Sequence, residues 1–372
     1  MTAVFASVAI GGTNCSVALA QSNGERFDWL GRRSFPTLES PIEVLDELVH
    51  RLACLLEESD GDELAGIGVV CGGPLDERAG LVLKPPNLPR WKAADPLSPF
   101  RTRFGVPVRL MNDANAGVLA EWAWGAAQGA NDAVFVTMGT GLGAGLIVDG
   151  RLHRGASGLA GEIGHWRLAE SGPRGHDKDG SFEGFCAGSG IANWAQQTAL
   201  RRLQEGAPSE LALDLSDLVD VSARKLGEAA AGGDTTAVEL WADIGRRLGA
   251  GLSLLIDLLN PDVIVIGGIF PRQRDRLEKA MLEELGREAI AESLSACRVV
   301  PSALGDQIAD YSGLAAALVG DDTTPAGRLL SGALPAPQSR RGVLAVADAG
   351  SSRGDADLSA TQPQAIKHRG QQ

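Results

Sequence analysis

The sequence has no apolar run that approaches the roughly 20 residues needed by a membrane-spanning helix. Its five cysteines show no paired spacing, and no charged start followed by an apolar stretch marks a secretory signal. These absences predict a cytoplasmic protein that folds without disulfides and has no membrane partner.

Basic residues are outnumbered by acidic ones, 34 against 47, which gives a formal net charge of −13. Upstream of residue 321 no cluster of lysine and arginine interrupts this excess. Such a surface repels a nucleic-acid backbone, so we expect no nucleic-acid partner. With 372 residues, 44% of them hydrophobic, the chain can bury a large core, and its length favours two domains.

Strand-like apolar runs alternate with helical patterns along the chain. Two strands are predicted within residues 4–19, and further strands at 66–71, 106–111, 133–138, 144–149 and 263–266. Helices are predicted at 41–58, 114–127, 190–200 and 239–260, the last ending at Asn260-Pro261. The alternation predicts an α/β protein. Residues 321–372, rich in Pro, Ser, Gly, Arg and Asp, predict a disordered tail.

Three glycine-rich turns each follow an apolar run, and they comprise Gly11, Gly12 and Thr13, then Gly139, Thr140 and Gly141, then Gly267 and Gly268. Glycine lets the backbone approach an anion closely, so successive N–H groups can bind phosphate oxygens. Any one of these turns alone is equally well explained as a tight turn. The P-loop ending and the dinucleotide glycine spacing are both missing, which disfavours a P-loop enzyme and a Rossmann dehydrogenase.

Asp113 follows Asn112 at the junction of a predicted strand and a predicted helix. A carboxylate at this place either caps the helix or lies at the rim of the sheet, where it can act as a general base. The sequence leaves both roles open, and one residue can serve both.

A second group of polar residues follows further along the chain. Glu162 and His165 are three residues apart, so they share a face in a helical turn and converge in a glycine-shaped loop. As a metal pair they lack further ligands at suitable spacing, and a surface loop explains them as well. Glu183 precedes a predicted helix and alone is an ordinary helix-initiating acid.

Taken together and in this order, these elements resemble the ROK family of sugar kinases and sugar-responsive repressors, in particular its glucokinase-like members. The resemblance runs from about residue 4 to 318 and rests on Gly11-Gly12-Thr13, Gly72-Gly73-Pro74, Pro86-Asn87-Leu88, Asn112-Asp113, residues 139–143, residues 161–165, Glu183 and residues 260–268. It implies a two-lobed, actin-like and hexokinase-like (ribonuclease H-like) fold with a cleft between the lobes. One lobe would span 1–113, with a final helix at 311–318 returning to it, and the other would span 114–310.

The resemblance also implies an activity, namely transfer of the γ-phosphate of ATP to the 6-hydroxyl of glucose or a related hexose. Asp113 would be the general base, and the sugar hydroxyls would be bound by Asn87, Asn112, Glu162, His165 and Glu183. The turns at Gly11 and Gly139 would flank the phosphates, and Gly267-Gly268 would lie near the adenosine. ATP, Mg²⁺ and a homodimer are the implied cofactors and partner, while mannose or an N-acetylhexosamine stays open as the substrate.

Two departures from the family pattern matter. Many members hold zinc with the histidine that corresponds to His165 and three cysteines, but residues 165–185 here contain no cysteine. His165 and His176 would leave two places to Asp177 or Asp179, a set that zinc rarely takes, so we expect no structural zinc and no other protein metal site.

The second departure is Ala9, which occupies the place of an acid that helps organise Mg²⁺ in the family. Losing one carboxylate weakens such a site without necessarily abolishing it. The alternative to a kinase is therefore a catalytically weak or silent sugar-binding sensor of the same fold. A repressor is disfavoured, because the first glycine turn begins at residue 11 and the charge is wrong for DNA.

Overall fold

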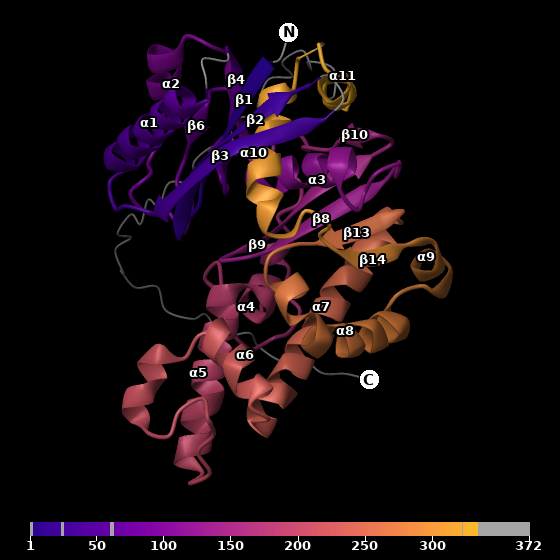
Figure 1. The fold of residues 1–372 in the computed structure, drawn as a ribbon. Coiled ribbons are helices and arrows are strands. Elements are labelled where there is room, and N and C mark those ends of the chain that lie inside the picture. The colour runs from indigo at the N-terminus through magenta and orange to yellow at the C-terminus, as the bar shows by residue number, and fades with distance from the viewer. Residues whose placement is uncertain (1–2, 24–25, 60–62, 322, 334–372) are drawn as a thin grey trace, which may run out of the picture. The chain divides into compact units, whose positions relative to one another are not determined.

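The computed structural model describes residues 3–333 except 24–25, 60–62 and 322. These residues fall within one compact unit, Met1–Pro335. Figure 1 shows its helices and strands. Among the described residues, none of the helices combines the length and the apolar character needed to cross a membrane.

The first sheet has five strands in the order β3-β2-β1-β4-β7. Strands β1 (Ala3–Ile10), β2 (Asn14–Ser22) and β3 (Phe27–Pro36) form an antiparallel meander. Strands β4 (Leu64–Cys71) and β7 (Val108–Asn112) are added in parallel beside β1. The two strands predicted within residues 4–19 are confirmed, and they pair as a hairpin around the first glycine turn.

The second sheet also has five strands, in the order β10-β9-β8-β13-β14. Here β8 (Ala133–Met138), β9 (Leu142–Val148) and β10 (Arg151–Leu152) form the meander. Strands β13 (Val263–Ile266) and β14 (Arg298–Pro301) are parallel to β8. Two short hairpins pair β5 (Leu75–Asp76) with β6 (Leu81–Val82), and β11 (Arg174–Gly175) with β12 (Lys178–Asp179).

The helices are α1 (Pro41–Glu58), α2 (Ser98–Phe104), α3 (Asp113–Trp124), α4 (Phe182–Cys186), α5 (Gly188–Gln204), α6 (Ala223–Ala231), α7 (Thr235–Leu259), α8 (Ile269–Glu288), α9 (Ala291–Ala296), α10 (Ile308–Leu318) and α11 (Pro325–Gly332). Short 3-10 helices cover Ile163–His165, Leu215–Asp220 and Gly305–Gln307. Helices α3 and α10 contact each other and pack against the sheets (Figure 1).

Both faces of the central strands are buried, which explains their nearly continuous apolar sequences. Alternate residues of β1 enter different cores, so Val4 packs with α1 residues such as Leu48, whereas Phe5 packs with α10 residues such as Leu314. In the second sheet, Phe135 of β8 shares the core of α3 and α10, while its neighbour Val136 packs with α7 and α8. The helices thereby fix the strand ends that carry the polar residues.

The structure corrects the expected start of the disordered tail. Thr324 caps α11 by accepting a hydrogen bond from the Gly327 amide at 2.9 Å, and Leu330 is fully buried in the core with α10. The short helix begins with the cap Thr324 and with Pro325, and it is anchored by the buried Leu330. The remainder of the expected tail, from residue 334, lies outside the described residues. The division into lobes at residue 113 stays a prediction.

Candidate functional site

Asn112 and Asp113 lie at the carboxyl end of β7, where α3 begins. Asn112 is the helix cap, since its Oδ1 accepts from the amides of Ala114 and Asn115 at 3.0 and 3.1 Å. The capping role considered for Asp113 therefore falls mainly to its neighbour. Asp113 is the first helical residue and its Oδ1 accepts from Ala114 at 2.9 Å. Its Oδ2 lies 3.7 Å from the position that a Cβ would take at Gly72.

Asp113 is accessible to solvent, yet many protein atoms lie around its carboxylate. Those surroundings desolvate the carboxylate and raise its pKa, and the negative charge of Glu162 adds to the increase. The Ala114 amide opposes it by binding the charged form. A carboxylate that water can reach and that holds its proton more tightly than usual suits general-base work near neutral pH.

Glu162 approaches this junction from another part of the chain, just before the 3-10 helix Ile163–His165. A Cβ at Gly73 would lie 3.6 Å from Glu162 Oε1 and 3.5 Å from Asn112 Nδ2. The Gly72-Gly73 pair after β4 thus faces both Asp113 and Glu162. The three predicted polar residues Asn112, Asp113 and Glu162 are brought together around it.

His165 and Glu183 are linked through His176. The imidazole rings of His165 and His176 stack with centroids 3.9 Å apart and planes at 22°. His176 Nε2 lies 2.8 Å from Glu183 Oε2, which also accepts from the Leu142 amide at 3.0 Å. Desolvation lowers the pKa of His165, and the neighbouring His176 lowers it further. The sequence indicated His176 only as a possible zinc ligand, and it did not predict this contact because an irregular polar loop carries no periodic signal.

Asn87 lies where the first two glycine turns meet. A Cβ at Gly12 would come within 2.6 Å of Asn87 Cβ, and one at Gly141 would lie 3.6 Å from Asn87 Nδ2 and 3.0 Å from Glu183 Oε2. The hydroxyls of Thr13 and Thr140 are 3.5 Å apart. Two turns that are separated by more than a hundred residues are therefore neighbours, and the predicted sugar residues border them.

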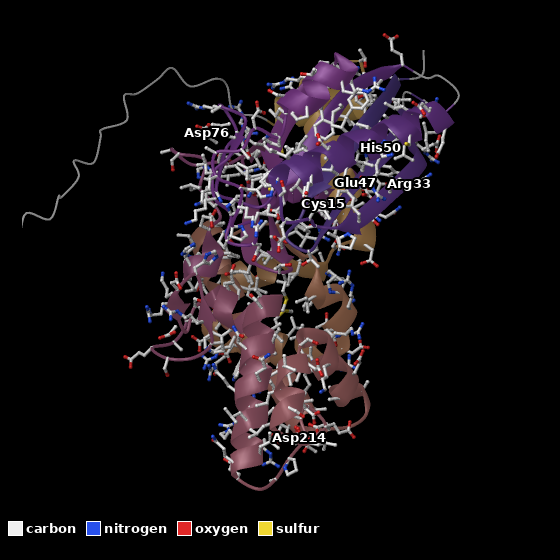
Figure 2. The ribbon with its side chains drawn as sticks, turned by 90° about the vertical axis from the view of Figure 1, so that its left-hand side faces the viewer. Cys15, Arg33, Glu47, His50, Asp76 and Asp214 are labelled. Carbon is white, nitrogen blue, oxygen red and sulfur yellow. The ribbon has the colours of Figure 1, made fainter. Side chains whose placement is uncertain are left out.

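The first turn is held in shape by Thr37, whose Oγ1 donates to the Gly11 carbonyl at 2.7 Å. Cys15 stands just after this turn, at the start of β2 (Figure 2). Burial raises the pKa of the Cys15 thiol, so it stays neutral. A neutral thiol adds no negative charge that would repel a phosphate at this turn.

The third turn packs on the second. Gly268 has a φ of +73°, and a Cβ there would lie 2.1 Å from the Met138 carbonyl oxygen, so only glycine fits. A small cavity of about 100 Å³ beside this turn is lined by Gly268, Pro271, Arg272, Gly305, Asp306 and Ile308. All three glycine turns thus lie in one region of the molecule.

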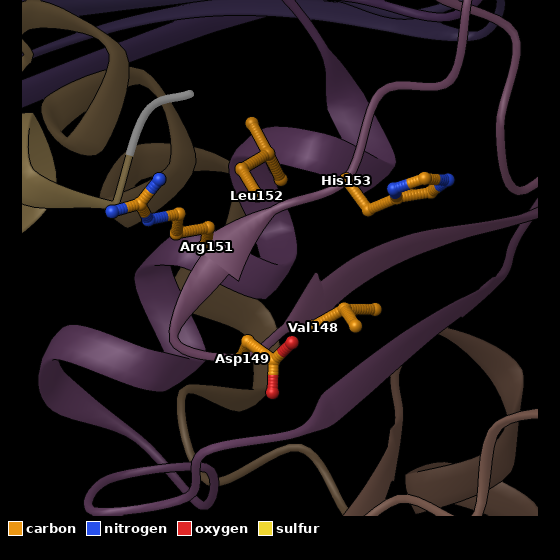
Figure 3. Close-up of a pocket in the computed structure, with 5 residues that line it drawn as sticks. All are labelled: Val148, Asp149, Arg151, Leu152 and His153. Carbon is orange, nitrogen blue, oxygen red and sulfur yellow. The ribbon is translucent and has the colours of Figure 1, made fainter. Parts of the chain in front are cut away.

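A larger cavity, of about 490 Å³, lies elsewhere, on the β9–β10 hairpin. Figure 3 shows its lining residues Val148, Asp149, Arg151, Leu152 and His153. None of the residues predicted to bind sugar or nucleotide lines it. Because the polar residues and the glycine turns converge away from this hairpin, we place the candidate site at Asp113.

The loop between His165 and Glu183 does not offer a zinc ligand set. Within the described part of the chain, no group of three or more His, Cys, Asp and Glu side chains is placed to hold a metal ion. His165 and His176 face each other with their ring planes, and Nε2 of His176 is engaged by Glu183. Other bonds hold the loop, since Ser181 Oγ donates to the Gly175 carbonyl at 3.1 Å and Lys178 Nζ to the His165 carbonyl at 2.6 Å.

Comparisons with known proteins agree with the sequence resemblance. The sequence model of the ROK family matches residues 5–320. The chain is 30% identical over 263 residues to a glucokinase of Streptomyces coelicolor, covering 70% of this chain and 80% of that protein.

Solved structures are also similar. A ROK glucokinase from Streptomyces griseus, in complex with glucose and AMPPNP, aligns with a TM-score of 0.69 at 27% identity, covering 83% of this chain and 97% of that one. A ROK transcriptional regulator, a homologue of the Escherichia coli MLC protein, aligns with a TM-score of 0.72 at 26% identity, covering 88% of this chain and 78% of that one. The chain therefore belongs to the ROK family and has the two-lobed, actin-like α/β fold of its sugar kinases.

Proposed function

We propose that the chain is an ATP-dependent hexose kinase that phosphorylates the 6-hydroxyl of glucose or a related hexose. The observation that carries the proposal is the proximity of Asp113 and Glu162 to Gly72-Gly73. Strand β4, which ends before this pair, lies beside β1, which leads into the first glycine turn, and that turn adjoins the second through Thr13 and Thr140. Similarity to glucokinases supports it further. Phosphoryl transfer asks mainly for positioning and charge neutralisation, which such an arrangement can supply.

In the proposed reaction, Asp113 Oδ2 accepts the proton of the sugar 6-hydroxyl while the 6-oxygen of the sugar bonds to the γ-phosphorus. The bond from the γ-phosphorus to the bridging oxygen breaks, and ADP leaves with that electron pair. Amides of the turns at Gly11 and Gly139 would bind the phosphates, and Gly267-Gly268 would border the adenosine. The raised pKa of Asp113 makes it a stronger base than an ordinary aspartate.

Five polar residues would bind the sugar, namely Asn87, Asn112, Glu162, His165 and Glu183. A hexose ring suits such a set, because each hydroxyl both donates and accepts hydrogen bonds. Bound Mg²⁺ would neutralise phosphate charge, and the Asp113 carboxylate, beside Gly72, would help to hold a magnesium–phosphate complex. Ala9 contributes only a methyl group there.

The second candidate is a sugar-binding regulator without turnover, and Ala9 together with the similarity to an MLC homologue favours it. A coupled assay for ADP separates the two, using Mg-ATP with glucose, mannose and N-acetylhexosamines. Turnover of one sugar that disappears in Asp113→Ala supports the kinase. Thermal stabilisation by a sugar without ADP formation would instead support the regulator.

A further inference from the structure

The β11–β12 hairpin accepts an unusual backbone in order to carry a histidine. Its two central residues, His176 and Asp177, have φ of +51° and +56°. Turns of this kind normally use Asn-Gly, since residues with larger side chains rarely adopt the left-handed conformation. The two side chains then behave differently, because that of Asp177 is 98% exposed whereas that of His176 is only 18% exposed.

His176 uses its inward position to contact two of the proposed sugar-binding residues. Its Nε2 lies 2.8 Å from Glu183 Oε2, and its ring stacks on His165. The Leu142 amide donates to the same Glu183 oxygen, so two nitrogen atoms contact Oε2. This arrangement leaves Oε1 of Glu183 as the oxygen that can accept from a ligand.

We propose that His176 is a positioning residue of the sugar site, holding Glu183 and His165 in the orientations that bind a hexose. This inference rests on the proposed sugar site and adds to it a residue outside the recognised motifs. His176 acts through its two neighbours and has no assigned contact with the sugar itself. Its contacts with Glu183 and His165 would hold this loop against the site, as a bound metal could hold a cysteine-rich loop.

The test is a calorimetric titration of glucose into the full-length protein without ATP, so that binding is measured apart from catalysis. His176→Ala is expected to weaken glucose binding about 10- to 100-fold, the effect of losing a hydrogen bond to a charged group. His176→Gln keeps a donor and should recover most of the affinity. His176→Phe keeps a stacking ring without the donor and should resemble His176→Ala. In turnover, KM for glucose should rise while kcat and KM for ATP change little.

Two variants separate positioning from a merely structural role. In His176→Asn, the asparagine tolerates the left-handed backbone but is too short to reach Glu183. The variant should therefore fold normally and yet bind glucose as weakly as His176→Ala. Asp177→Asn alters the other left-handed residue of the same turn and should leave glucose affinity unchanged. Melting temperatures without sugar verify that each variant is folded.

Three further outcomes would contradict the inference. Wild-type affinity in His176→Ala or His176→Asn would overturn the inference and leave the kinase proposal standing. A wild-type protein that binds none of glucose, mannose and the N-acetylhexosamines would overturn both. Loss of glucose binding after dialysis against EDTA would show that a metal holds the loop and would also overturn the inference.

Discussion

The two five-stranded sheets share one strand arrangement but carry different residues at their strand ends. Each consists of a meander of three consecutive strands with two later strands added in parallel beside the first. The helix that follows the last strand of each sheet packs on the other sheet, because α3 contacts β8 and β9 while α10 contacts β1 and β4. The shared strand arrangement fixes where the strands end, but it does not determine which side chains lie there.

The difference is clearest at the ends of β7 and β14. At the end of β7 lie Asn112, its last residue, and Asp113, and their side chains approach Gly73 and Gly72. After β14 comes Ser302, whose hydroxyl donates to Glu121, a carboxylate of α3 with no exposed surface. Equivalent positions of one frame thus hold reactive groups in the first sheet and a buried structural contact in the second.

Replacing Asp113 by Asn should have the largest effect on activity. Losing the general base should lower kcat on the order of 10² to 10⁴-fold, with little change in the melting temperature. Ser302→Ala should do the reverse, costing about 1–3 kcal/mol of stability because it removes a donor from buried Glu121. Steady-state kinetics and thermal melts of both variants measure the contrast. Equal losses of activity in the two proteins would contradict it.

Helices α3 and α10 each pack closely against a glycine of a neighbouring strand. A Cβ at Gly145 of β9 would lie 2.1 Å from the Ala114 carbonyl of α3, and one at Gly68 of β4 would lie 2.0 Å from the Gly313 carbonyl of α10. Gly145→Ala and Gly68→Ala should each cost about 1–3 kcal/mol or more, since the added methyl group separates helix from sheet.

Activity should distinguish these two glycine variants. Gly145→Ala displaces the helical turn that carries Asp113, so kcat should fall even in protein that remains folded. As a matched control, a Cβ at Gly286 of α8 meets no atom within 4 Å, and Gly286→Ala should stabilise the protein by about 0.5–1 kcal/mol. Chemical denaturation measures all three. Unchanged stability in Gly68→Ala would show that α10 does not depend on this close approach.

Regular elements with a strong apolar pattern could be predicted from the sequence. Helix α1 has the predicted bounds, because Val44, Leu48 and Leu52 recur at helical spacing and are buried. Strand β3 escaped prediction because it lies at the sheet edge and most of its residues are exposed or only partly buried. The contacts of His176 could not be predicted either, because they require a non-glycine left-handed turn that sequence preferences argue against.

An acid can also be introduced at position 9, where the family pattern has one and this chain has alanine. Ala9 lies in β1, and only β4 separates it from β7, after which Asp113 follows. Ala9→Asp should raise the affinity for Mg²⁺ about 10-fold, the scale of effect for a group that orients metal-bound water. The measurement is the Mg²⁺ dependence of kcat/KM at saturating ATP, with Ala9→Asn as the uncharged control. Identical Mg²⁺ curves would mean that this position does not influence the metal.

The smallest expected effect concerns the pH dependence of the same carboxylate. Desolvation and the charge of Glu162 raise the pKa of Asp113, and the base works only when it is deprotonated. The acid limb of kcat/KM for the sugar should therefore lie above the pKa of an ordinary aspartate. Glu162→Gln removes the repelling charge, stabilises the charged form of Asp113 and should move that limb to lower pH. Ionisation of ATP is common to both proteins, so the displacement between their profiles isolates Asp113, and a displacement to higher pH would contradict the assigned coupling.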